Sequence, residues 1–294
     1  MARMIERRNK TRAPEKGIAV LYHGSCNDGF GGAWAAWKKF GNRADYVAMY
    51  RDTPAPDIRN KVVYFIDYTL SRKETERFIA RNKRVTCIDH HITAKETVMI
   101  TEAPSFSLDH SGAVLAWEYF HPGKKIPLLL RYIEDRDLWR WKMPKAREIL
   151  SGTNFSNEAV WTFKGFSKLV ADFEKSAYRA QCIKDGKIAK SVIDGFVEKI
   201  ASHAVSVKLG GAKALAVNAP EFFSSAVGNY LVQKMGAPFA IIWHIDGKTF
   251  RASLRSGGGA NVAKIAERFG GGGHERSAGF VIKNFKKLPW DLSR

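Results

Sequence analysis

Short apolar stretches alternate with amphipathic ones over the first hundred residues. The apolar stretches are continuous, as in strands buried on both faces, and they cover residues 17–22, 62–66 and 85–88. Helical spacing follows the first two, over residues 34–40 and 71–80, and Ser71 with Glu74 has the spacing of a capping box. This order of strand, helix and strand predicts a parallel sheet covered by helices.

The pattern changes twice in the rest of the chain. Residues 111–202 are mostly helical, and the amphipathic stretch 174–200 could form a connecting helix. Strand patterns then return at 213–217, 239–244, 249–254 and 278–282, with a helix at 261–269. We therefore expect an α/β protein with a parallel-sheet domain and a smaller C-terminal α/β domain, joined by a helical linker. The expected segments are a basic tail (1–16), the first domain (17–172), the linker (173–202), the second domain (203–285) and a tail (286–294).

Composition and charge narrow the class of protein. The 294 residues are 45% hydrophobic, which excludes a wholly disordered chain. No apolar run has the length of a membrane span, and the basic N-terminus lacks the apolar segment of a secretory signal. Three scattered cysteines favour a reducing, cytoplasmic setting. With 48 Lys and Arg against 29 Asp and Glu, the net charge of +19 indicates nucleic acid or a phosphorylated metabolite as partner.

Carboxylates and imidazoles follow the predicted parallel strands. His23 ends the first strand, Asp67 follows the second, and Asp89, His90 and His91 follow the third. The carboxyl ends of parallel strands share one edge of the sheet, where ligands bind in α/β proteins. Oxygen ligands with imidazoles suit Mn²⁺ or Mg²⁺ and also allow Fe, Co or Zn. Two such ions form the usual clamp for hydrolysis of phosphate esters.

A simpler interpretation exists for each acidic residue alone. A lone Asp at a strand end is more often a helix N-cap than a ligand, and Asp67 before Ser71 could be one. The triplet Asp89-His90-His91 directly after an apolar strand is harder to explain this way, so the joint pattern favours a metal site.

Several segments together resemble the four motifs of the DHH phosphoesterases. These are residues 23–29 (HGSCNDG), Asp67, the triplet 89–91 and Asp137. Residues 251–256, 269–274 and 278–279 resemble the DHH-associated domain that usually accompanies them. The superfamily includes RecJ-like exonucleases, nano-RNases, cyclic-dinucleotide phosphodiesterases and family II pyrophosphatases.

The resemblance implies roles for these residues. His23 and Asp67 would hold one metal ion, and Asp67 would bridge to a second ion. The ligands of the second ion would be Asp28, Asp67, His90 and Asp137. The catalytic residues would be Asp89, which orients His90, and His91, which donates a hydrogen bond to the substrate phosphate. Asp137 is preferred to Asp135 because the family's fourth motif often has an aromatic residue shortly after its Asp, as Trp139 is here.

Cys26 departs from the pattern, because the family's first motif usually has Asp at this position. Either Cys26 is a thiolate ligand and favours Zn or Fe, or it does not bind metal and weakens the first site. The second alternative is slightly favoured.

The second domain has a glycine-histidine segment that suits an anion. The run 270–273 could be a flexible linker, but it lies between a predicted helix and a predicted strand. Glycines there would let backbone N–H groups approach an anion closely. Arg251, Ser253 and Arg255 stand at alternate positions and would share one strand face, where an arginine can bind a phosphate. The expected substrate-binding residues are Arg251, Ser253, Arg255, Gly271, Gly272, Gly273 and His274.

The leading hypothesis is a phosphodiesterase with two divalent ions, Mn²⁺ above all and otherwise Mg²⁺, Zn²⁺ or Fe²⁺. It would hydrolyse short RNA or DNA oligonucleotides to mononucleotides. The alternatives are a phosphatase for small phosphorylated nucleotides, a cyclic-dinucleotide phosphodiesterase, or a nucleic-acid-binding protein that has lost activity through Cys26. We expect no membrane partner, and a homodimer is left open.

Overall fold

The computed structural model describes residues 16–24, 26–50, 54–153 and 158–292. Residues 1–15 of the expected basic tail and the last two residues of the chain therefore lie outside the described residues. The chain divides into two compact units, Met1–Ala189 and Lys190–Arg294. Each unit has its own sheet, which confirms the expected α/β class.

The first unit is built on a five-stranded parallel sheet of order β2-β1-β3-β4-β5. The strands are β1 (Ile18–His23), β2 (Ala44–Met49), β3 (Val62–Ile66), β4 (Arg84–Asp89) and β5 (Ser105–Phe106). The three predicted strands are thus β1, β3 and β4. The edge strands β2 and β5 escaped the sequence analysis, because β2 mixes Asp45 and Tyr46 with apolar residues and β5 is only two residues long.

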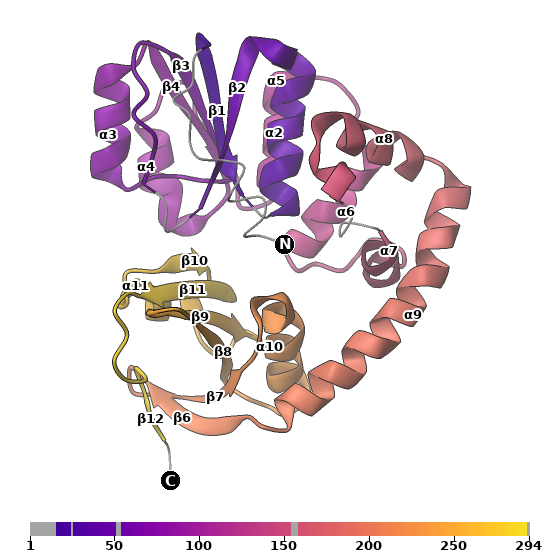
Figure 1. Cartoon of the computed structure of the whole chain (residues 1–294), viewed down its shortest axis with the longest axis vertical. Coiled ribbons are helices and arrows are strands. Elements are labelled where there is room, and N and C mark those ends of the chain that lie inside the picture. Colours follow the sequence, from indigo (N-terminus) through magenta and orange to yellow (C-terminus); the bar gives the residue numbers. More distant parts are fainter. Residues whose placement is uncertain (1–15, 25, 51–53, 154–157, 293–294) are drawn as a thin grey trace. The chain divides into compact units, whose positions relative to one another are not determined.

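Helices cover both faces of this sheet (Figure 1). On one face, α3 (Arg72–Arg81) and α4 (Lys95–Met99) pack on Leu21, Phe65 and Cys87. On the other, α2 (Asn27–Phe40) and α5 (Gly112–Phe120) pack on Val20, Ile66 and Ile88. The predicted capping box is confirmed, since Ser71 and Glu74 exchange hydrogen bonds at the start of α3.

The remaining helices of this unit are short and follow the sheet. They are α6 (Leu128–Asp137), α7 (Ala146–Gly152) and α8 (Phe163–Phe173), and their core includes Phe166, Phe173 and Leu129. Single 3-10 turns cover Gly41–Arg43, Ile92–Ala94, Glu158–Trp161 and, in the second unit, Glu221–Phe223. The long helix α9 (Ser176–Ala201) covers most of the stretch where a connecting helix was expected, and the boundary between the two units falls within it.

The second unit has a seven-stranded mixed sheet of order β10-β11-β9-β8-β7-β6-β12. The strands are β6 (Val205–Leu209), β7 (Ala212–Asn218), β8 (Phe239–Asp246), β9 (Thr249–Ser256), β10 (Gly272–His274), β11 (Ser277–Ile282) and β12 (Asp291–Leu292). Only β7 and β8 pair in parallel. Helix α11 (Val262–Glu267) packs on one face with Phe250 and Leu254, and α10 (Ser224–Gln233) packs on the other with Ala240 and Ile242.

Among the described residues, no helix combines the length and the apolar character needed to cross a membrane.

Helix α2 begins at Asn27, well before the predicted start at Trp34. Its first turns contain Gly29, Gly31 and Gly32, which weaken a helical pattern in sequence but allow close packing. A Cβ on Gly32 would lie 2.4 Å from Cγ2 of Ile66, a distance that real side chains do not reach. Gly32 therefore serves the fit of α2 against the sheet, whereas a Cβ on Gly31 would meet Ala113 and Leu130 of neighbouring helices.

We expect Gly32→Ala to lower the free energy of unfolding by about 1–3 kcal/mol, because the added methyl group overpacks the helix-sheet interface. Gly195→Ala is the matched control, since a Cβ on Gly195 of α9 meets no atom within 4 Å. That change should stabilise the protein slightly through helix propensity. Urea unfolding of both variants measures the difference, and equal effects would contradict the packing argument.

Candidate metal centre

Five secondary-structure elements bring the predicted ligands together at the carboxyl edge of the parallel sheet. His23 is the last residue of β1, Asp67 directly follows β3, and His90 directly follows β4. Asp28 lies in the first turn of α2, and Asp137 is the last residue of α6. Residues from distant parts of the sequence thus form one cluster, in which Asp28, Asp67 and His90 are almost fully buried.

Asp67 is shared between two groups of side chains. Its Oδ2 lies 3.2 Å from Nδ1 of His23, and its Oδ1 lies 3.2 Å from Nε2 of His90. The residue has a φ of 53°, an unfavourable value for a residue with a Cβ. It does not cap α3, because Ser71 does. The cap interpretation of Asp67 is therefore wrong, and its carboxylate is aimed at the imidazoles.

His90 is the centre of the second group. Its Nε2 lies 3.4 Å from Oδ2 of Asp137 and 3.7 Å from Oδ2 of Asp28. The Oδ2 atom of Asp137 is buried, and no hydrogen-bond partner for it exists among the described residues. A buried carboxylate oxygen normally has a partner, so this atom is positioned for a cation.

Asp28 is held from behind by the start of α5. Its two oxygens accept hydrogen bonds from the backbone N–H groups of Gly112, at 2.7 Å, and Ala113, at 3.0 Å. A Cβ on Gly112 would lie 2.6 Å from Cβ of Asp67 and 3.0 Å from Oδ2 of Asp28. Only glycine fits here, and the sequence analysis gave Gly112 no role.

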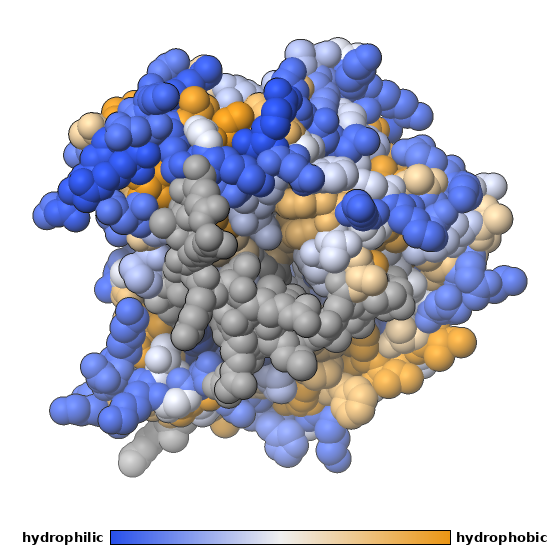
Figure 2. All heavy atoms as spheres, turned by 45° about the horizontal axis from the view of Figure 1, so that its top comes forward, coloured by the Kyte–Doolittle hydropathy of each residue, from blue (hydrophilic) through white to orange (hydrophobic). Residues whose placement is uncertain are grey.

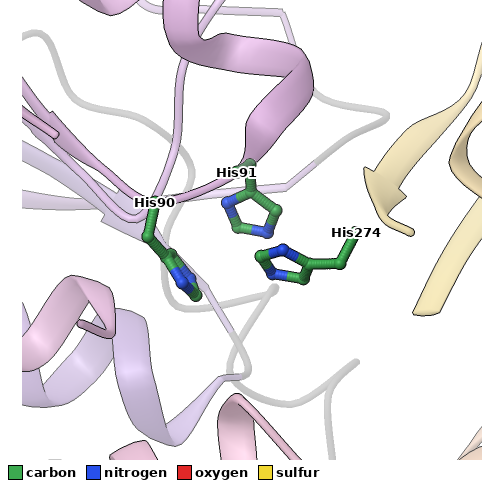
Figure 3. A group of neighbouring side chains, drawn as sticks. All are labelled: His90, His91 and His274. Carbon is green, nitrogen blue, oxygen red and sulfur yellow. The ribbon is translucent and has the colours of Figure 1, made fainter. Parts of the chain in front are cut away.

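Asp89 positions His91 rather than the ring of His90. Its Oδ1 lies 2.7 Å from Nδ1 of His91 and also accepts the backbone N–H groups of His90 and His91. Thr69, another residue that the sequence analysis missed, donates its hydroxyl to Oδ2 of Asp89 at 2.6 Å. The expected orientation of the His90 ring by Asp89 is therefore not what the structure shows. Figure 3 shows the rings of His90 and His91 side by side after β4; His274, which it also draws, belongs to the second unit.

The choice between Asp135 and Asp137 follows from their contacts. Asp135 is buried, and its oxygens accept the backbone N–H groups of Lys142 and Met143 at 2.8 and 3.0 Å. It therefore holds the loop after α6, whereas Asp137 faces His90. Trp139 and Trp141 in this loop have left-handed backbone conformations and lie edge to face with each other.

Cys26 lies beside His23 at the position before α2, and its thiol hydrogen-bonds to that histidine. Ligand atoms of His23, Cys26 and Asp67 lie within 4.8 Å of one another. Burial raises the pKa of the Cys26 thiol, and the bond to His23 opposes this shift only in part. The thiol is thus neutral unless a cation favours the thiolate.

The charges of the cluster are strongly perturbed. Burial, then the neighbouring carboxylates of Asp67 and Asp137, raise the pKa of Asp28 well above its usual value. Burial also raises the pKa of Asp137. Burial acts in the same sense on Asp67, but hydrogen bonds with His23 and His90 outweigh it and lower the pKa of this carboxyl.

The imidazoles respond in the opposite sense. Burial alone would favour neutral rings, but the hydrogen bond to Asp67 and the charge of Asp137 raise the pKa of His90 to about 10. The hydrogen bonds to Asp67 and Cys26 likewise raise the pKa of His23 well above its usual value. In the protein alone, protons neutralise a cluster of acidic groups that a divalent cation would also neutralise.

The donor set fits two divalent ions. One group combines His23, Cys26 and Asp67, and the other combines Asp28, His90 and Asp137, with ligand atoms of each group within 4.8 Å of one another. Asp67 directs one oxygen to each group, as a bridging carboxylate does. Imidazole and carboxylate ligands suit Mn²⁺ and Fe²⁺, while a thiolate would shift the preference toward Zn²⁺.

The predicted binding residues of the second unit lie on two strands. Arg251, Ser253 and Arg255 alternate with buried residues along β9, so the three share the face opposite α11, as predicted. Arg255 is itself buried: it donates to Oγ of Ser225 and to the carbonyl of Leu254, both at 2.9 Å. Burial lowers the pKa of Arg255 to about 10. This arginine helps to fasten α10 to the sheet.

The glycine run of the second unit is packed structure. Gly272 and Gly273 belong to β10, which pairs with β11, and His274 ends the strand. A Cβ on Gly271 would lie 2.1 Å from the carbonyl oxygen of Gly279, and Gly273 has a φ of 141°. The flexible-linker interpretation is therefore wrong, and glycine is required by close strand contact.

Comparisons with known proteins agree with this architecture. The DHHA1 domain family matches residues 219–290, which confirms the resemblance to DHH phosphoesterases with a C-terminal DHHA1 domain. This match lies within the second unit and supports the C-terminal part of that resemblance.

The individual proteins that resemble this chain share less than a third of its sequence. The chain is 29% identical to uncharacterized protein R106 of Acanthamoeba polyphaga mimivirus, over 92% of this chain and 69% of that protein. Among solved structures, the pGpG-specific phosphodiesterase PggH of Vibrio cholerae has a TM-score of 0.48 and 13% identity, covering 91% of this chain and 94% of that chain. RecJ of Thermus thermophilus in complex with Mg²⁺ has a TM-score of 0.41 and 14% identity, covering 90% and 47%.

We expect Asp67→Asn to weaken Mn²⁺ binding about 100-fold, because the change removes charge from the one residue shared by both ligand groups. Isothermal titration calorimetry of the metal-free protein measures the affinity. Asp109→Asn is the matched control, since the Asp109 side chain is 91% exposed and outside the cluster. Unchanged affinity in Asp67→Asn would contradict the bridging role.

We expect Cys26→Ser to retain the metal content of the wild type within about twofold, because the raised pKa of the thiol disfavours a thiolate ligand. Inductively coupled plasma mass spectrometry of the purified proteins measures this content. Cys182→Ser in α9 controls for loss of a thiol elsewhere. Selective loss of Zn or Fe from Cys26→Ser alone would establish thiolate ligation instead.

Proposed function

We propose that the protein is a divalent-metal-dependent phosphodiesterase that hydrolyses short oligonucleotides to mononucleotides. The observation that carries the proposal is the shared carboxylate of Asp67, with one oxygen toward His23 and the other toward His90. Two ligand groups joined by one carboxylate are the arrangement expected of a two-ion phosphoesterase site. Mn²⁺ is the ion we propose, with Mg²⁺, Zn²⁺ and Fe²⁺ as competitors in the assay.

The bound ions would supply a hydroxide nucleophile and stabilise charge on the phosphate. The ligand residues His23, Asp28, Asp67, His90 and Asp137 would fix the ions at the sheet edge. Asp89 Oδ1 lies 2.7 Å from Nδ1 of His91 and fixes this ring, so that its Nε2 would face a phosphate oxygen. In this proposal, Asp89 and His91 act as a positioning carboxylate and a donor to the developing charge.

The second unit would recognise the nucleotide. In this proposal Gly272, Gly273, His274 and Arg251 contact a terminal phosphate, whereas the backbone N–H of Gly271 already donates to the carbonyl of Ala266. Arg255 contributes by holding α10 and the strand in place, given its contact with Ser225. The net charge of +19 favours a polyanionic substrate over a small neutral one.

Substrate length tests this proposal. With Mn²⁺, the protein should hydrolyse a 5′-labelled dinucleotide faster than a longer RNA, and faster than 3′-phosphoadenosine 5′-phosphate, a cyclic dinucleotide or pyrophosphate. We expect His91→Gln to lower kcat about 100-fold with Mn²⁺ binding intact, because a donor to the transition state is lost. We expect His274→Gln to raise KM chiefly.

The pattern of activity decides among the alternatives. Preference for 3′-phosphoadenosine 5′-phosphate or a cyclic dinucleotide would replace the oligonucleotide assignment while keeping the metal centre. Tight RNA binding with no hydrolysis of any substrate would favour an inactive nucleic-acid-binding protein, the alternative raised by Cys26 in place of the usual Asp.

A further inference from the structure

Helix α9 has large apolar side chains on its solvent-facing side. Ile188, Val192 and Phe196 are 70%, 57% and 56% exposed, and their spacing of four places them along one side of the helix. The opposite side carries the buried residues Cys182, Gly186, Val197 and Ala201. Figure 2 shows that hydrophobic side chains remain on the surface of the molecule among hydrophilic ones.

The apolar strip continues beyond the helix. The ring of Phe196 lies 6.2 Å from that of Phe223, which in turn lies 5.1 Å from the ring of Phe222. Phe222 is 75% exposed. Contiguous apolar surface of this kind marks an interaction site rather than the scattered apolar residues of an ordinary surface.

Charged residues of opposite sign bound this strip on α9. Asp185 and Lys199 lie seven residues before and after Val192 and are both exposed. Positions 185, 188, 192, 195 and 199 follow the three-and-four spacing of a coiled-coil seam; position 195 is a glycine, and Phe196 beside it supplies the apolar side chain. The seam spans about 21 Å along the helix axis, from the rise of 1.5 Å per residue.

This seam is complementary to itself when one copy is reversed. With a twofold axis at Val192, Asp185 of one copy faces Lys199 of the other, and Ile188 faces Phe196. A parallel pairing would instead place like charges opposite each other. Twofold symmetry requires such self-complementarity of one surface patch.

We infer that two copies of this chain associate through antiparallel pairing of their α9 helices, centred on Val192. The occupant of the exposed strip is therefore a second copy of the chain. The inference rests on residues outside the metal centre, so it stands or falls independently of the proposed reaction.

Sedimentation velocity of the full chain over a range of concentrations tests the dimer. We expect Val192→Glu to weaken association at least tenfold, because two carboxylates would meet at the axis. Asp185→Lys and Lys199→Asp should each weaken it, and the double variant Asp185→Lys/Lys199→Asp should restore it, because the opposite charges again face each other.

The controls separate this effect from misfolding and from net charge. Val192 is exposed, so Val192→Glu should keep the circular dichroism and Mn²⁺ affinity of the wild type. Glu96→Lys on the exposed side of α4 makes the same charge change as Asp185→Lys without touching the seam. A monomeric wild type, a Val192→Glu dimer as tight as wild type, or no restoration in the double variant would overturn the inference.

Discussion

The metal centre depends on carboxylates that are buried together at one edge of a sheet. Strand β3 and helices α2 and α6 deliver Asp67, Asp28 and Asp137 to a space where water screens them poorly, so their charges repel one another strongly. The protein meets this cost by placing imidazoles between them, and His90 faces all three carboxylates. Such a site is stable only with compensating positive charge, which protons supply in the free protein and divalent cations supply better.

Backbone groups, not side-chain chemistry alone, give the cluster its geometry. The N-terminus of α5 holds Asp28, the backbone N–H groups of His90 and His91 hold Asp89, and a left-handed conformation turns Asp67 toward its partners. These contacts explain why the ligand residues stay in place despite their repulsion. The positions without a side chain, Gly32 and Gly112, are part of the same design, since each allows a helix to approach the ligand-bearing strands.

The sequence was most informative where strands were continuous apolar runs. β1, β3 and β4 could be predicted with the polar residues that follow them, and therefore so could the place of the cluster. The edge strand β2 could not, because Asp45 and Tyr46 interrupt its apolar run. The start of α2 was hidden by glycines, and the packing partner of Gly32, Ile66, is remote in sequence. The sequence also suggested that Asp89 orients the ring of His90, whereas the structure places it beside the ring of His91. The directions of these two adjacent side chains depend on the turn after β4, which the sequence pattern does not reveal. The burial of Arg255 depended on α10, a helix with no clear pattern of its own.

The contact between Asp28 and α5 has a consequence for how the protein responds to its ligand. The carboxylate of Asp28, which would bind a cation, also lies at the N-terminus of α5 and accepts the first backbone N–H groups of that helix. A cation bound by Asp28 would hold the carboxylate in place against the N-terminus of α5. Ion binding would therefore slow amide exchange at Gly112 and Ala113, whose backbone N–H groups donate to this carboxylate, and the exchange rates would report the occupancy of the centre.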